Sequence, residues 1–135
     1  PIPLGKGDIK REGSDVTVIA TGKMVHEALA AAEELQKEGL SVEVLDPRTL
    51  YPLDKELIER SIAKTHKAVI VTEENRRGGY GGELSAIIAE EMFDYLDGPV
   101  VRIGALDSPV PFAPVLEQLY IPNSKDIVKA VREMA

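Results

Sequence analysis

Residues 16–45 read VTVIATGKMVHEALAAAEELQKEGLSVEVL, and this stretch decides the fold. Its first five residues have the apolar, β-branched composition of a buried strand. The apolar positions that follow have the 3.6-residue period of a helix: Val25, Ala28, Leu29, Ala32 and Leu35. Gly39 is a typical helix stop, and residues 42–45, VEVL, predict a second strand. A strand, a helix and a strand with short connections predict a right-handed crossover in a parallel sheet.

The alternation continues to the end of the chain. Asp54 is a good N-cap for a second helix, with Leu53 and Ile58 placed as a hydrophobic staple. Further strands are expected at 68–72 and 100–103, and further helices over 84–96 and from about Ser124. Residues 6–11 and the turn at 12–15, EGSD, predict a hairpin with the strand at 16–20.

We therefore predict one α/β domain over residues 1–135. It has three layers, with a mostly parallel sheet of about five strands between helices on both faces and one antiparallel edge strand. The net charge of −7 argues against nucleic acid or an anionic membrane as a partner. The absence of cysteine excludes disulfides, thiolate nucleophiles and cysteine-based metal sites.

The glycine-rich loop 76–82, RRGGYGG, lies where phosphate-binding loops occur, beyond the carboxyl end of a strand. It lacks the last glycine of a dinucleotide fingerprint and the lysine of a P-loop. Glu83 in the first helical turn would also repel an anion. We expect these glycines to let the loop lie against a neighbouring backbone.

The acidic residues in these loops do not form a recognisable catalytic pattern. Asp46 is expected to cap a turn, with Arg48 as a nearby ion partner. The adjacent carboxylates at 73–74 point in opposite directions in an extended segment, and Arg76 and Arg77 are near enough in sequence to neutralise them.

The two histidines have no identified partners. His66 precedes the third expected strand, at the wrong edge of the sheet for a site, and His26 lies in the first turn of a helix. We predict no catalytic, cofactor-binding or metal-binding residue in this chain.

Residues 96–113, LDGPVVRIGALDSPVPFA, enclose a short strand between two segments that proline holds rigid. The stretch contains no histidine, cysteine or lysine. This combination indicates a surface for docking rather than for reaction.

Several segments, taken in order, resemble the C-terminal domain of the transketolase superfamily. They are VTVIATGKMV (16–25), DPRTLYPLD (46–54) and Glu73-Glu74 before the glycine-rich loop. Within that superfamily, LDGPVVRI (96–103), DSPVPFA (107–113) and IPN (121–123) resemble the beta subunit of the 2-oxo acid dehydrogenases, which act on pyruvate, branched-chain oxo acids or acetoin.

The resemblance implies a parent enzyme that uses thiamine diphosphate and magnesium, both bound outside this domain. That enzyme performs oxidative decarboxylation of a 2-oxo acid with acyl transfer to lipoyl groups. The chain would be a fragment of a longer beta subunit, in the cytoplasm or, in a eukaryote, in the mitochondrial matrix.

The implied partners are the alpha subunit, a second beta subunit and the basic subunit-binding domain of dihydrolipoyl acyltransferase. The implied docking residues are Asp97 and the C-terminal Ala135. Asp97 is equally suited to be a turn residue before Gly98-Pro99.

Two alternatives remain open at this point. One is the equivalent domain of transketolase, deoxyxylulose phosphate synthase or an oxo acid:ferredoxin oxidoreductase. The other is a stand-alone flavodoxin-like domain that binds a small ligand.

Overall fold

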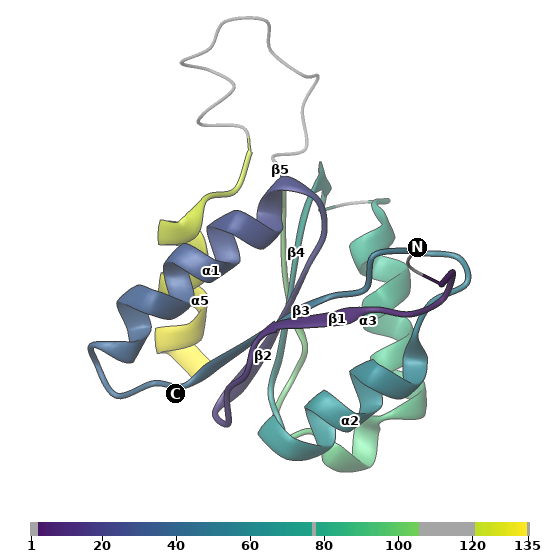
Figure 1. Ribbon diagram of the computed structural model, residues 1–135, viewed down its shortest axis with the longest axis horizontal. Coiled ribbons are helices and arrows are strands. Elements are labelled where there is room, and N and C mark those ends of the chain that lie inside the picture. Colours follow the sequence, from purple (N-terminus) through teal and green to yellow (C-terminus); the bar gives the residue numbers. More distant parts are fainter. Residues whose placement is uncertain (1–2, 77, 106–120, 135) are drawn as a thin grey trace, which may run out of the picture.

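The computed structural model describes residues 3–76, 78–105 and 121–134, which form an α/β sandwich of three layers (Figure 1). The strands are β1 (Asp8–Arg11), β2 (Val16–Ala20), β3 (Val42–Asp46), β4 (Ala68–Asn75) and β5 (Val101–Ala105). The helices are α1 (Lys23–Gln36), α2 (Lys55–Thr65), α3 (Tyr80–Glu91), the short 3-10 helix η1 (Phe93–Tyr95) and α5 (Ser124–Met134). The predicted order of strands and helices is confirmed. The loop at 107–113, Arg77 and Ala135 lie outside the described residues.

The described strands form one sheet in the order β1-β3-β2-β4-β5. β2 pairs in parallel with β3 on one side and with β4 on the other, and β5 is parallel to β4. β1 is antiparallel, as expected for the edge strand, but the predicted hairpin with β2 is wrong because β1 pairs with β3. Both hydrogen-bonding edges of β2 are taken by parallel neighbours, so β1 occupies the free edge of β3 instead.

Two hydrophobic clusters fill the space between the layers. Strand residues alternate between them, since successive side chains of a strand point to opposite faces. In β2, Val18 packs under α1 and α5, whereas Ile19 packs under α2 and α3. Figure 1 shows α1 and α5 side by side on one face of the sheet, with α2 and α3 on the other.

The helix boundaries follow the expected signals at α1 and α2. Asp54 accepts a hydrogen bond from Leu57 N at 3.1 Å, and Leu53 and Ile58 pack in the same cluster, as a staple requires. Gly39, just after α1, has a φ of 84°, a conformation that glycine adopts without strain.

The third predicted helix is too long at its C-terminal end. α3 ends at Glu91, and the backbone of Met92 leaves the helical region with a φ of −126°. Leu96 therefore lies beyond the helix, where it still packs against the α2–α3 cluster. The apolar period extends past the helix because Leu96 is part of this core without being helical, and the following Asp97-Gly98-Pro99 does not favour helix.

Candidate functional site

The parallel strands give the sheet an amino edge, where β2 to β5 begin, and a carboxyl edge, where they end. Asp97 lies at the amino edge, in the bend before β5, and its side chain is exposed. Its backbone N donates a hydrogen bond to His66 O at 2.9 Å. His66 Nδ1 is 2.8 Å from Tyr95 O, so this ring nitrogen carries the proton of that bond. These two contacts fix the bend that carries Asp97 against the start of β4.

The end of α5 lies at the same edge of the sheet (Figure 1). Beside it is a cleft of about 210 Å³. The cleft is lined by Asp15, Val16, Leu40, Lys67, Val131 and Met134. Lys67 directly follows His66, so the cleft and the Asp97 bend meet on the two residues that precede β4. Ala135, the other predicted docking residue, lies outside the described residues, but its neighbour Met134 is in this cleft.

The two histidines lie where the sequence predicts. His66 is at the amino edge, after α2, and His26 is exposed in the first turn of α1. His66 makes the contact with Tyr95 O described above.

The glycine-rich loop at the carboxyl edge is held by hydrogen bonds between loop and strand. Glu74 Oε2 accepts a hydrogen bond from Tyr80 N at 3.0 Å and so caps α3. Arg76 Nε donates to Arg102 O at 3.3 Å, and Arg102 Nη1 donates to Arg76 O at 2.9 Å. The sequence suggested that Arg76 neutralises the carboxylates at 73–74, but its guanidinium instead donates to the β5 backbone.

The expected close approach of this loop to a neighbouring backbone is made at Gly104 of β5. A Cβ at Gly104 would lie 2.7 Å from the N and Cα atoms of Arg76 and 2.9 Å from Glu74 O. Within the loop, Gly81 packs at ordinary distance on β4, where its Cβ would meet Thr72 Cγ2 at 3.6 Å. The prediction is therefore wrong for three glycines of the loop, since a Cβ at Gly78 would meet none of the described atoms within 4 Å and one at Gly81 or Gly82 would meet only side chains. The close backbone approach is made by a glycine outside the loop, Gly104.

Asp46 caps a turn, as predicted, because its Oδ1 accepts a hydrogen bond from Arg48 N at 2.8 Å. The predicted ion partner is wrong. The Arg48 guanidinium lies 3.0 Å from Asp8 Oδ2 in β1, and Lys10 contacts the same oxygen at 3.0 Å. The hydrogen bond from Lys10, together with the Arg48 charge, lowers the pKa of Asp8.

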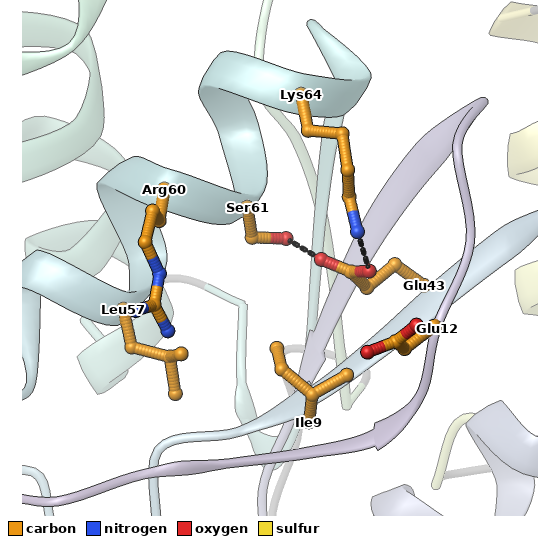
Figure 2. Close-up of a pocket in the computed structure, with 7 residues that line it drawn as sticks. All are labelled: Ile9, Glu12, Glu43, Leu57, Arg60, Ser61 and Lys64. Carbon is orange, nitrogen blue, oxygen red and sulfur yellow. Dashed lines mark hydrogen bonds and ion pairs between the residues drawn. The ribbon is translucent and has the colours of Figure 1, made fainter.

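A pocket of about 310 Å³ opens between β1, β3 and α2 (Figure 2). Glu43 of β3 forms its base, with a side chain only 2% exposed. The Glu43 carboxylate accepts hydrogen bonds from Ser61 Oγ at 2.6 Å and from Gly13 N at 3.1 Å, and it forms an ion pair with Lys64. A buried charge with this set of partners is stabilised by the protein itself.

The polar contacts continue inward from Ser61. Thr17 Oγ1 lies 2.7 Å from Ser61 Oγ and 2.7 Å from Thr65 Oγ1. An ionised carboxylate only accepts, so Ser61 donates to Glu43, Thr17 donates to Ser61, and Thr65 donates to Thr17. No buried polar side-chain atom among the described residues lacks a partner. We therefore assign this pocket a structural role, joining α2 to β2 and β3.

The sequence interpretation did not single out Glu43. The sequence does contain a signal for a buried ion pair, because Glu43 is a lone carboxylate in an otherwise apolar strand. Glu is almost never fully buried unless it is paired. Within the described ranges, no group of three His, Asp or Glu side chains is placed to hold a metal ion. No helix in the described part of the chain is long and apolar enough to cross a membrane.

Comparison with known proteins gives consistent results. The family model described as "Transketolase, C-terminal domain" matches residues 5–127. The chain is 49% identical over 133 residues to the acetoin:2,6-dichlorophenolindophenol oxidoreductase subunit beta of Bacillus subtilis (strain 168), covering 98% of this chain and 39% of that protein. It is 46% identical over 135 residues to the 2-oxoisovalerate dehydrogenase subunit beta of the same organism, covering 99% of this chain and 41% of that protein.

A third relative is the mitochondrial pyruvate dehydrogenase E1 component subunit beta of Pisum sativum, which is 47% identical over 97% of this chain and 36% of that protein. Among solved structures, a split gene transketolase described as an inactive beta4 tetramer superposes with a TM-score of 0.84. The sequence identity is 34%, and the match covers 98% of this chain and 42% of that chain. The chain thus spans 36% to 42% of the length of these relatives.

Proposed function

The chain belongs to the transketolase C-terminal domain family, and on this premise we propose that it is the C-terminal domain of the beta subunit of a 2-oxo acid dehydrogenase. Its role is to associate with other subunits and to dock the acyltransferase. The observation that carries the proposal is the identity of 46% to 49%, over nearly the whole chain, to three proteins named as beta subunits. The names of these relatives refer to acetoin, 2-oxoisovalerate and pyruvate, so the substrate class is a small 2-oxo acid or acetoin.

The parent enzyme uses thiamine diphosphate and magnesium, which are bound outside this domain. The chemistry of the described residues supports this assignment, because the most buried carboxylate, Glu43, already has protein partners. The cofactor provides the carbanion chemistry of decarboxylation. This domain contributes surfaces that hold the other subunits and the acyltransferase in place.

The amino edge is the proposed acyltransferase-docking surface. Asp97 is exposed there, and its carboxylate has no hydrogen-bond or ion-pair partner among the residues described. Next to it, η1 presents Phe93, which is 70% exposed, and the exposed Asp94. An exposed aromatic ring beside free carboxylates suits a basic partner, since aromatic residues are enriched at interfaces and complementary charge steers association.

The test is a titration of the intact beta subunit, assembled with its alpha subunit, with the basic subunit-binding domain of the acyltransferase at several salt concentrations. Binding is expected to weaken as salt rises. Asp97→Ala is expected to weaken it by about tenfold, equivalent to about 1.4 kcal/mol.

The matched control is Glu33→Ala, which removes the same charge from an exposed position on α1. It is expected to leave binding nearly unchanged. Equal effects of the two substitutions would show that only net charge matters. Absence of any binding would contradict the docking role.

The similarity to a split gene transketolase supports a second candidate, the equivalent domain of a transketolase-type enzyme. The two candidates differ in whether they bind an acyltransferase, because a transketolase does not need one. Binding of the subunit-binding domain therefore separates them in the same titration.

A further inference from the structure

Two large apolar side chains are exposed together at the carboxyl edge of the sheet. Tyr51 is 96% exposed and Leu4 is 78% exposed. The two segments that carry them are in contact, because a Cβ on Gly5 would be only 3.2 Å from Pro52 Cγ. Pro52 is also exposed, so the two residues and this proline form one apolar surface, which we call the Leu4–Tyr51 patch.

Hydrogen bonds hold both sides of this patch in place. Thr49 Oγ1 accepts a hydrogen bond from Gly5 N at 3.2 Å and donates one to Pro52 O at 2.9 Å. One hydroxyl therefore joins the N-terminal segment that carries Leu4 to the turn that carries Tyr51.

Two further contacts fix the same segments to the helices of the α2–α3 layer. The Tyr80 hydroxyl of α3 donates to Leu50 O at 2.8 Å. Burial and the nearby Glu83 charge raise the pKa of Tyr80, so this hydroxyl remains a donor. Asp54 Oδ2 accepts a hydrogen bond from Gly7 N at 2.9 Å while its other oxygen caps α2.

Single exposed apolar residues are normal on protein surfaces, but grouped and fixed ones are typical of contact surfaces. The hydrogen bonds of Thr49 and Tyr80 hold the backbone that carries this patch, so little backbone conformational entropy is lost when the patch is covered. The patch also lies at the edge opposite Asp97, so it can be covered while the amino edge binds another partner.

We propose that the Leu4–Tyr51 patch packs against the part of the beta subunit that precedes this domain. This inference rests on the proposed function, in which the domain is joined to a larger part of the same polypeptide. The relatives are longer than this chain, which covers 39% and 41% of the two from Bacillus subtilis. Under the proposed function, Leu4 lies in the segment that connects to that preceding part, which brings that part within reach of the patch.

The test is photo-crosslinking in the assembled enzyme. A benzoylphenylalanine replaces Tyr51 in the intact beta subunit, which is assembled with its alpha subunit and irradiated. The expected product is a crosslink within one beta polypeptide, which leaves its mass unchanged and joins residue 51 to a peptide that precedes this domain. The control carries the same photoreactive residue at Glu33, which is exposed on α1, and is expected to give no such peptide.

Three outcomes would overturn the inference. These are a crosslink to the alpha subunit, a crosslink to a second beta subunit, and no crosslink at residue 51. Titration of each irradiated sample with the subunit-binding domain is the second readout. If that domain binds but the expected crosslink is missing, this inference alone fails, whereas loss of binding to unmodified enzyme contradicts the proposed function.

A second variant guards against failure to assemble. Tyr51→Ser with Leu4→Ser removes the apolar patch without removing the hydrogen bonds that Thr49 makes. The double variant is expected to make the junction before this domain at least about tenfold more sensitive to proteolysis, because a docked surface protects its connection. Unchanged cleavage at that junction would contradict the inference.

Discussion

The Ser61 hydroxyl donates a hydrogen bond to Glu43 Oε2 at 2.6 Å, and this bond joins α2 to β3 at the base of a pocket. Glu43 and Ser61 are both buried. If this bond is lost, the Glu43 oxygen cannot be fully rehydrated, and a buried acceptor without a donor lowers the stability of the fold.

Ser61→Ala is expected to lower the free energy of unfolding by about 1–3 kcal/mol, because it leaves one oxygen of Glu43 without a donor and removes the acceptor of the Thr17 hydroxyl. Urea denaturation at pH 7 measures the change. Ser14→Ala is the control, since Ser14 is exposed, and it is expected to stay within about 0.5 kcal/mol of the parent. Equal stability of the two variants would contradict the role assigned to Ser61.

Gly104→Ala is expected to destabilise the fold by about 1–3 kcal/mol, because its Cβ would overlap the backbone of Arg76. The Cβ would lie 2.7 Å from two atoms of that residue. The matched control is Gly98→Ala, whose Cβ would meet no atom of the described residues within 4 Å. Thermal denaturation compares the two, and a neutral Gly104→Ala would show that the loop can move away from β5.

Asp54→Ala is expected to cost about 1–2 kcal/mol, because α2 loses its N-cap. The same substitution frees Gly7 N, which Asp54 Oδ2 binds. Asp54→Asn keeps one acceptor for the Leu57 amide and is expected to cost less. Urea denaturation of both variants separates the cap from the link to the N-terminal segment, and an equal cost would contradict this division.

Glu38 gives a pH-dependent contribution to stability. The hydrogen bond from Arg132 holds the pKa of Glu38 below its usual value of 4.5. The contact is two-pronged, with Arg132 Nε donating to Oε1 at 2.9 Å and Nη2 donating to Oε2 at 2.6 Å. Because the folded-state pKa is depressed, the stabilisation is present above pH 4.5 and is lost as the pH falls through the folded-state value.

Glu38→Gln is therefore expected to be less stable than the parent at neutral pH and equally stable at a pH low enough to protonate Glu38 in the folded protein. Urea denaturation across that range measures the difference between the two proteins. The control is Glu33→Gln on α1, whose difference in stability from the parent is expected to stay constant across that range. A constant difference for Glu38→Gln would contradict the assignment of the ion pair.

The fold is predictable because each element carries its own local signal. The apolar run of β2, the cap at Asp54 and the stop at Gly39 all act within a few residues, and the structure confirms each. The partner of β1 is not local. The turn at 12–15 indicates a reversal of the chain, but β3 and β4 occupy both edges of β2, and β1 pairs with the outer edge of β3.

The same distinction separates the predicted contacts from those that the sequence missed. Asp46 caps its own turn two residues away, whereas the partner of Arg48 is Asp8, 40 positions earlier. Ser61 is 18 positions from Glu43, on a helix whose rotation about its axis depends on the packed core. Such pairings follow from the tertiary structure and cannot be obtained from residue types alone.

The central position of β2 determines how the native state fluctuates. All five of its residues are buried, and it has a hydrogen-bonded neighbour on each side. Its amide hydrogens therefore exchange with solvent only in molecules that have unfolded completely, while the edge strand β1 exchanges through local opening. The exchange rates of the β2 amides thus report the global stability of the native protein, without denaturant.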